Sequence, residues 1–137
     1  MAGYSSTPLH RKLGIKPGHR VLLRGAPEGF ESCLDPLADG VRILKSARSP
    51  VNVIVAFFDS EAAMLKSFPG LMKLMLPDAG LWIGWPKKSS GVPTDLSFDR
   101  VQTAGLDAGL VDNKICALDD TWSGLRLVIR KENRRLP

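Results

Sequence analysis

Side chains of the types that commonly bind anions lie at the ends of two apolar runs of this sequence. Arg24 ends the run RVLLR, and Lys87, Lys88 and Ser89 come directly after the run LWIGWP. Guanidinium, ammonium and hydroxyl groups are common donors to phosphate and carboxylate oxygens. Their placement predicts a site for a small anionic or nucleotide-like ligand.

A glycine loop and two further side chains complete this predicted site. Gly25 and Gly29 bracket Glu28, and glycine lets the backbone approach a ligand closely. Asp59 follows the strongly apolar run VNVIVAFF. Trp122 lies in the polar turn DDTWSG, where it either covers the core or stacks on a ligand. All five residues belong to the predicted site.

The sequence contains no recognised catalytic motif. Neither histidine has a serine or cysteine partner in a known pattern, and there is no nucleophile elbow, phosphate-binding loop or metal-spaced cluster. Thr94 and Asp95 are interpreted as a helix cap, and Asp95 is also an acid–base candidate beside Lys87 and Lys88. No metal site is predicted, and whether the chain is an enzyme is left open.

Apolar runs bounded by turn residues predict about six strands. The last two are joined by a connection short enough for an antiparallel hairpin. The carboxyl ends of the parallel strands should meet at one rim, where such sheets bind ligands. The predicted strands are Arg20–Arg24, Val41–Leu44, Val51–Phe58, Leu81–Trp85, Val111–Leu118 and Leu125–Arg130.

Helices are expected between these strands, which makes the fold class α/β. The prediction is a small Rossmann-like, mostly parallel sheet with helices on both faces and a C-terminal antiparallel hairpin. The second helix carries Pro69-Gly70, where we expect a kink or a break. The helices should run from Pro27 to about Leu37, from a cap at Asp59 or Ser60 past Met64 and Phe68, and from about Phe98 to near Gly109.

The composition is that of a globular domain without a membrane span. The chain has 137 residues, 44% of them hydrophobic and 24% charged, with a formal net charge of +5. We expect a single domain over 1–137, with a lead-in over 1–19 and a basic tail over 131–137. The tail has no aromatic residues, so we interpret it as solvated and disfavour nucleic acid as a partner.

The two cysteines indicate a reducing compartment. Cys33 and Cys116 are isolated from each other, which gives no disulfide framework. We interpret both as buried, inert thiols and expect a cytoplasmic protein. The sequence does not indicate an oligomeric state.

The segment KLGIKPGHRVLLRGAPEGF resembles the opening of class I S-adenosylmethionine (SAM)-dependent methyltransferases, which pair a Lys-Pro-Gly turn with a strand and a glycine-rich loop. VNVIVAFF resembles their fourth strand, AGLWIGWP their fifth, and the closing pair their terminal hairpin. The resemblance implies a truncated version of that fold, lacking one strand and helix between Leu44 and Val51.

A second resemblance covers the whole chain. The segments GAPEGF, WPKKSSGVPTDL and DNKICALDDTWSGLR are similar to those of a bacterial family of short proteins catalogued as a domain of unknown function. This resemblance implies no particular activity.

The residues of the glycine loop depart from the methyltransferase motif. Pro27 replaces its middle glycine, and Leu23 stands in place of its acid, followed by the cation Arg24. Lys45–Arg48 offers no carboxylate where a second acid is expected. On these grounds SAM is considered and disfavoured. A binding protein without catalysis is the preferred hypothesis, and a divergent SAM-dependent methyltransferase and a non-catalytic interaction module are the alternatives.

Overall fold

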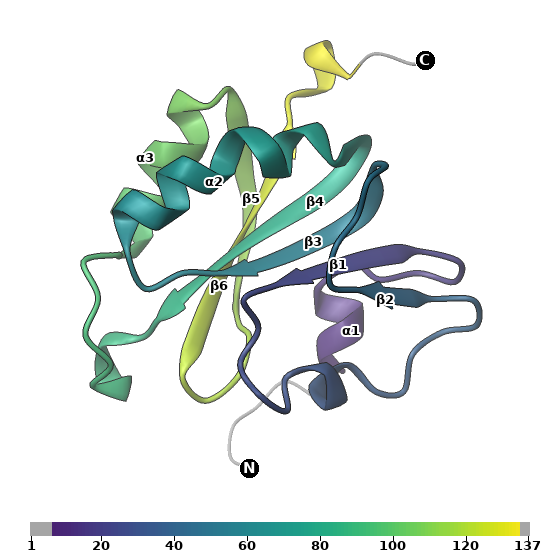
Figure 1. Cartoon of the computed structure of the whole chain (residues 1–137), viewed down its shortest axis with the longest axis horizontal. Coiled ribbons are helices and arrows are strands. Elements are labelled where there is room, and N and C mark those ends of the chain that lie inside the picture. Colours follow the sequence, from purple (N-terminus) through teal and green to yellow (C-terminus); the bar gives the residue numbers. More distant parts are fainter. Residues whose placement is uncertain (1–6, 135–137) are drawn as a thin grey trace.

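The computed structural model describes residues 7–134. They form a six-stranded sheet in the order β2-β1-β3-β4-β6-β5 (Figure 1). Neighbouring strands from β2 to β4 are parallel, and β6 runs antiparallel to both β4 and β5. The mostly parallel sheet with a closing hairpin is confirmed. The strands are β1 Arg20–Arg24, β2 Arg42–Leu44, β3 Val51–Phe57, β4 Met75–Pro86, β5 Leu110–Ala117 and β6 Trp122–Ile129.

Helices lie on both faces of this sheet, and the longer ones share one face. Figure 1 shows α2 and α3 together on one side and the short α1 on the other. The helices are α1 Leu9–Lys12, α2 Glu61–Lys73 and α3 Phe98–Asp107, with the 3-10 turns η1 Glu31–Leu34, η2 Lys88–Ser90 and η3 Lys131–Asn133.

The core is divided by the sheet into two layers. Alternate residues of β3 point to opposite faces, so Ile54 packs in the layer under α2 and α3 while Val53 and Val55 pack in the other. The second layer is closed by Leu13 near α1 and by Leu34 of η1. β3 is therefore buried on both faces, as expected for a central parallel strand.

Helix α2 is continuous through Pro69, so the expected break into two short helices is wrong. Its first turn is capped by Ser60, whose Oγ accepts a hydrogen bond from the Ala63 amide at 3.3 Å. Pro69 cannot donate to the carbonyl of Leu65, but both residues are exposed, and water can bond that carbonyl. Phe68 and Leu71, which precede and follow Pro69 in the helix, are buried and hold the helix against the sheet.

The helix predicted from Pro27 to Leu37 is not formed. The backbone of Gly29 has φ +84°, a left-handed conformation that ends any helix started at Pro27. Only the four-residue turn η1 follows, and the chain then continues in extended form at Asp35. A loop and a short turn therefore occupy the place of a full helix beside β1.

The two cysteines differ in their surroundings. Cys33 is exposed, so the expectation that it is buried is wrong. Cys116 is half-buried, and burial raises the pKa of its thiol, which keeps it protonated at neutral pH.

No helix among residues 7–134 is long and apolar enough to cross a membrane. Residues 135–137 of the predicted basic tail lie outside the described residues.

Candidate functional site

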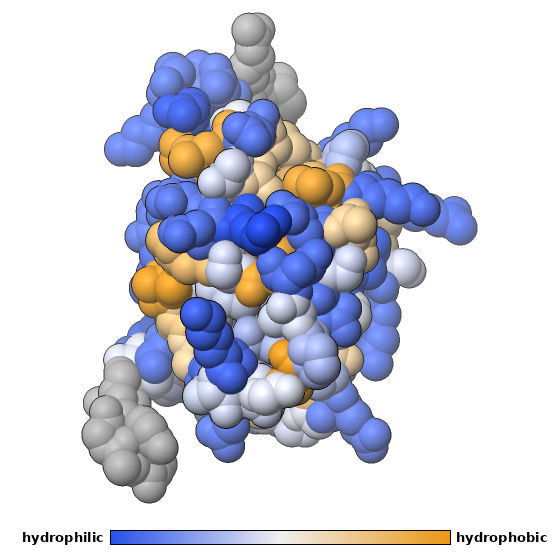
Figure 2. Space-filling model, turned by 90° about the vertical axis from the view of Figure 1, so that its left-hand side faces the viewer, coloured by the Kyte–Doolittle hydropathy of each residue, from blue (hydrophilic) through white to orange (hydrophobic). Residues whose placement is uncertain are grey.

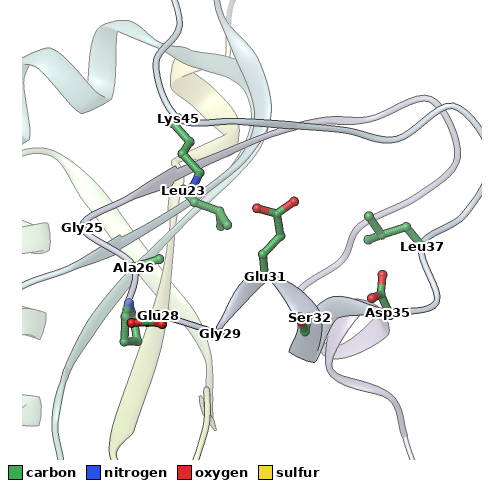
Figure 3. Close-up of a pocket in the computed structure, with 11 residues that line it drawn as sticks. Leu23, Gly25, Ala26, Glu28, Gly29, Glu31, Ser32, Asp35, Leu37 and Lys45 are labelled. Carbon is green, nitrogen blue, oxygen red and sulfur yellow. The ribbon is translucent and has the colours of Figure 1, made fainter.

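A cavity of about 590 Å³ opens at the carboxyl ends of β1 and β2. It lies on the face of the sheet opposite α2, where Leu23 of β1 forms part of its floor (Figure 3). Its lining comes from β1, the glycine loop, η1 and the end of β2. These residues are Leu23, Gly25, Ala26, Pro27, Glu28, Gly29, Glu31, Ser32, Asp35, Leu37 and Lys45.

The glycine loop fixes one wall of the cavity. Gly25 has φ +70°, and a Cβ placed there would lie 3.1 Å from the carbonyl oxygen of Phe57. The loop therefore passes close to β3, and both this contact and the positive φ disfavour a side chain at this position. Phe30 anchors its far end, because its ring is buried and meets Phe57 edge-on at a centroid distance of 4.9 Å.

Carboxylates dominate the charged groups of the cavity. The lining includes three carboxylates, those of Glu28, Glu31 and Asp35, and one ammonium group, that of Lys45, which gives a formal charge of −2. The structure shows no ion pair or side-chain hydrogen bond for any of these four residues within the part of the chain that it describes. Their polar groups are thus available to a ligand.

Glu31 has the most direct position in this cavity. Figure 3 shows its side chain rising from η1 into the space between Leu23 and Leu37, with Asp35 beside Leu37. A carboxylate flanked by two leucine side chains suits a ligand that combines an apolar ring with hydroxyl or amino donors.

Three of the predicted site residues line the cavity, and six do not. Gly25, Glu28 and Gly29 are brought together there. The cavity is negative rather than positive, contrary to the expected cationic crevice, because the predicted cations lie elsewhere. The residues outside its lining are Arg24, Asp59, Lys87, Lys88, Ser89 and Trp122. A ligand-binding role for any of the nine stays a prediction.

Two of those six residues, Lys87 and Trp122, lie near each other at the neighbouring strand ends. The backbone amide of Lys87 donates to the carbonyl of Thr121 at 2.8 Å, which places Lys87 beside the β5–β6 turn. Trp122 in that turn is half-buried and packs edge-on against Phe57 at 5.2 Å. Trp122 therefore covers the core, which was one of its two interpretations.

The strand ends form a largely polar face. Figure 2 shows the side of the molecule toward which the arrows of β1, β3 and β4 point, with hydrophilic residues predominant and hydrophobic ones in small separate groups.

Thr94 and Asp95 hold the loop after β4 in place. The carboxylate of Asp95 accepts a hydrogen bond from the Glu61 amide at 2.8 Å, and the Thr94 hydroxyl donates to the carbonyl of Asp59 at 2.8 Å. Asp95 therefore caps α2 from a distance, while Ser97 caps α3 through the Arg100 amide. This capping bond is a structural role for Asp95.

Sequence reasoning missed Glu31, Asp35 and Lys45. Glu31 and Asp35 fell within a predicted helix that does not form. Lys45 was noted only because it stands where a second acid was expected. One signal against a long helix was present, because Gly29 and Pro36 leave only six residues between them.

No family model matches this chain, and no curated protein matches it in sequence. Solved structures do match its fold. One is a SAM-dependent methyltransferase from Aquifex aeolicus, with a TM-score of 0.63 and 21% identity over 85% of this chain and 85% of that chain. A second is Aeropyrum pernix fibrillarin with natively bound SAM, with a TM-score of 0.60 and 15% identity over 92% and 70% of the two chains. A third is a TehB-like SAM-dependent methyltransferase from Corynebacterium glutamicum, with a TM-score of 0.58 and 10% identity over 94% and 91%.

The chain therefore has the Rossmann-like fold of SAM-dependent methyltransferases, in a small form of 137 residues. These comparisons also correct the sequence argument that disfavoured SAM, because proteins of this fold hold SAM itself. In the methyltransferase motif, acids are expected at two positions, which correspond here to Leu23 and to the end of β2. The structure supplies carboxylates to the same cavity from the glycine loop and η1 instead.

Proposed function

We propose that this protein binds SAM in the cavity beside β1 and acts as a minimal methyltransferase. The observation that carries the proposal is the set of unpaired carboxylates that surround this cavity at the carboxyl ends of β1 and β2. The shared fold supports it. The proposal takes the place of the preferred hypothesis from the sequence, a binding protein without catalysis.

The residues of the cavity fit the chemistry of this cofactor. A volume of about 590 Å³ falls within the range of roughly 300–1,000 Å³ typical of small-molecule sites. SAM carries a sulfonium and an ammonium group, one carboxylate, ribose hydroxyls and an adenine ring. An acidic cavity with one lysine and two leucines offers a complementary group to each of these.

Each residue would then have a distinct task. The carboxylates of Glu31 and Asp35 accept hydrogen bonds from hydroxyl or ammonium donors, and Lys45 pairs with a carboxylate. Leu23 and Leu37 cover an apolar ring. When bound, SAM supplies an electrophilic methyl group, and the chain's own contribution is to hold and orient it.

Calorimetric titration of the purified protein with SAM tests the binding step. We expect saturable binding that Glu31→Gln weakens about tenfold or more, because a hydrogen bond to a charged group contributes about 1.5–3 kcal/mol. Glu132→Gln, in the exposed turn η3, is the matched control and should bind SAM as the wild type does. The absence of binding at millimolar SAM would refute the proposal.

Catalysis requires a separate measurement. Conversion of SAM to S-adenosylhomocysteine, followed with candidate acceptors, separates a methyltransferase from a protein that only binds SAM. Conversion that Glu31→Gln reduces and Glu132→Gln leaves unchanged supports methyl transfer from this cavity. If SAM binds but is not converted with any acceptor, methyl transfer is refuted and the hypothesis of a non-catalytic binding protein is supported.

A further inference from the structure

A second, smaller cavity lies at the opposite end of β1, among the amino ends of the parallel strands. Its volume is about 120 Å³. It shares no residue with the carboxylate-lined cavity, so it is a separate site and its ligand does not rest on the proposed function. Its lining residues are Gly14, Lys16, His19, Asn52, Val53, Asp78 and Arg126.

His19 contributes a hydrogen-bond donor to this cavity. Its Nδ1 accepts the backbone amide of Lys16 at 3.1 Å, across a turn that Pro17 and Gly18 form. A nitrogen that accepts carries no proton, so the neutral ring is protonated at Nε2. Burial and the nearby charge of Lys16 lower the pKa of His19, which favours this neutral form.

Asn52 also contributes a donor. Its side-chain oxygen accepts the backbone amide of Arg20 at 2.8 Å, which fixes the orientation of the amide group. The NH₂ group of Asn52 remains without a partner among the described residues, and Asn52 lines the cavity.

Arg126 is the half-buried cation of the cavity. Its guanidinium lies over Gly80, where an added Cβ would be 2.5 Å from Nε, so the glycine makes the space that the guanidinium occupies. Within residues 7–134 no carboxylate lies within 4.0 Å of it, and its Nη1 donates only to Asn113 Oδ1 at 3.3 Å. Burial and the charge of Arg134 lower the pKa of Arg126, and Asp78 opposes them. A cation removed from water without a paired anion is destabilising.

We propose that this cavity binds a small oxyanion, a phosphate or carboxylate group. Four of its lining residues carry hydrogen-bond donors: the ammonium of Lys16, Nε2 of His19, the amide of Asn52 and the guanidinium of Arg126. Asp78 is the only carboxylate in the lining, so two cations and one anion leave a formal charge of +1. A bound oxyanion forms the direct ion pair with Arg126 that Asp78, more than 4.0 Å away, does not form, and it accepts hydrogen bonds from the unpartnered groups.

Asn52→Asp is the most selective variant for testing this site. It keeps an oxygen for the Arg20 amide and replaces the donor with a negative charge. Thr103→Asp adds the same charge at an exposed position of α3 and is the matched control. Asp78→Asn removes the opposing carboxylate. Each variant is titrated with inorganic phosphate, and in parallel with acetate, by calorimetry in a buffer free of oxyanions.

We expect phosphate or acetate to bind the wild type and Thr103→Asp with equal affinity. Binding to Asn52→Asp should be weaker by a factor of about ten or more, because a hydrogen bond to a charged group is lost. Asp78→Asn should bind more tightly than the wild type. No binding of either anion at millimolar concentration would overturn the proposal, as would equal binding by Asn52→Asp. If Asn52→Asp does not fold, Asp78→Asn decides, because unchanged or weaker binding there also overturns it.

Discussion

Gly25 is the residue on which the geometry of the glycine loop depends most. Its φ of +70° favours glycine, and an added Cβ would meet the carbonyl oxygen of Phe57 at 3.1 Å. Gly25→Ala should lower the free energy of unfolding by about 1–3 kcal/mol, the cost of a non-glycine residue in a left-handed conformation. Urea unfolding measures this change.

Gly70→Ala is the matched control for that substitution. Gly70 lies in α2 with no atom within 4 Å of an added Cβ, and its φ is not positive. Alanine there should leave stability unchanged or raise it by up to about 1 kcal/mol. Equal effects at the two positions would contradict the role assigned to the loop conformation.

We expect the free energy of unfolding to depend on pH because of His19. Burial first, and then Lys16, lower its pKa below the usual 6.5, while Asp78 opposes them. Between the lowered pKa and 6.5 the unfolded chain binds more protons than the folded one, so the free energy of unfolding falls as pH is lowered through this window.

Urea unfolding between about pH 7.5 and about pH 5.5, the range around an ordinary histidine pKa, should show this loss. His19→Asn keeps an acceptor for the Lys16 amide but does not titrate. The variant should therefore lose less stability than the wild type over the same range. Identical pH profiles for the two proteins would be inconsistent with a lowered pKa of His19.

At the scale of elements, the loop after β4 and the start of α2 form one unit. The Asp95 carboxylate accepts the first amide of α2, that of Glu61, and Arg100 of α3 pairs with the Glu61 carboxylate at 2.6 Å. Asp95→Ala should lower the free energy of unfolding by about 0.5–2 kcal/mol, as the loss of a helix cap does.

Chemical denaturation measures this change, with Asp107→Asn as the control. Asp107 is exposed at the end of α3, and its side chain forms no hydrogen bond with any of residues 7–134, so its removal should change stability by less than about 0.5 kcal/mol. A similarly small effect at Asp95 would mean that the capping bond contributes little.

The elements that sequence predicts well are those with strong local patterns. β3 follows from its β-branched apolar run, and α3 follows from its helical spacing and from Gly109, whose φ is +92°. The predicted break at Pro69 fails because tertiary contacts of Phe68 and Leu71 outweigh one lost hydrogen bond on the exposed side.

The candidate site was predicted in part. Gly25, Glu28 and Gly29 follow from topology, because parallel strands place their carboxyl ends at one rim. Glu31 could not be placed, because its direction depends on whether the chain after Gly29 forms a helix or a short turn. That choice depends on packing around Phe30, which is a long-range property of the fold.

For the whole molecule, burial predicts a gradient of local stability. Six of the seven residues of β3 are buried, whereas α1 and β2 contain no buried residue. Amide hydrogen exchange should be slowest in β3 and the paired part of β4, and fastest in α1 and β2. Uniform protection across the sheet would contradict this gradient.

The position of β6 between β4 and β5 has a consequence for how the protein is made. When a ribosome has delivered the residues up to Ala117, β5 exists without the strand beside which it lies. Strands β1 to β4 can pair with one another earlier, but β5 can join the sheet only after β6 has emerged up to Ile129. A truncated protein that ends before Trp122 would leave β4, with Leu81 and Ile83, as an unpaired edge strand. We expect such a protein to be prone to proteolysis and aggregation.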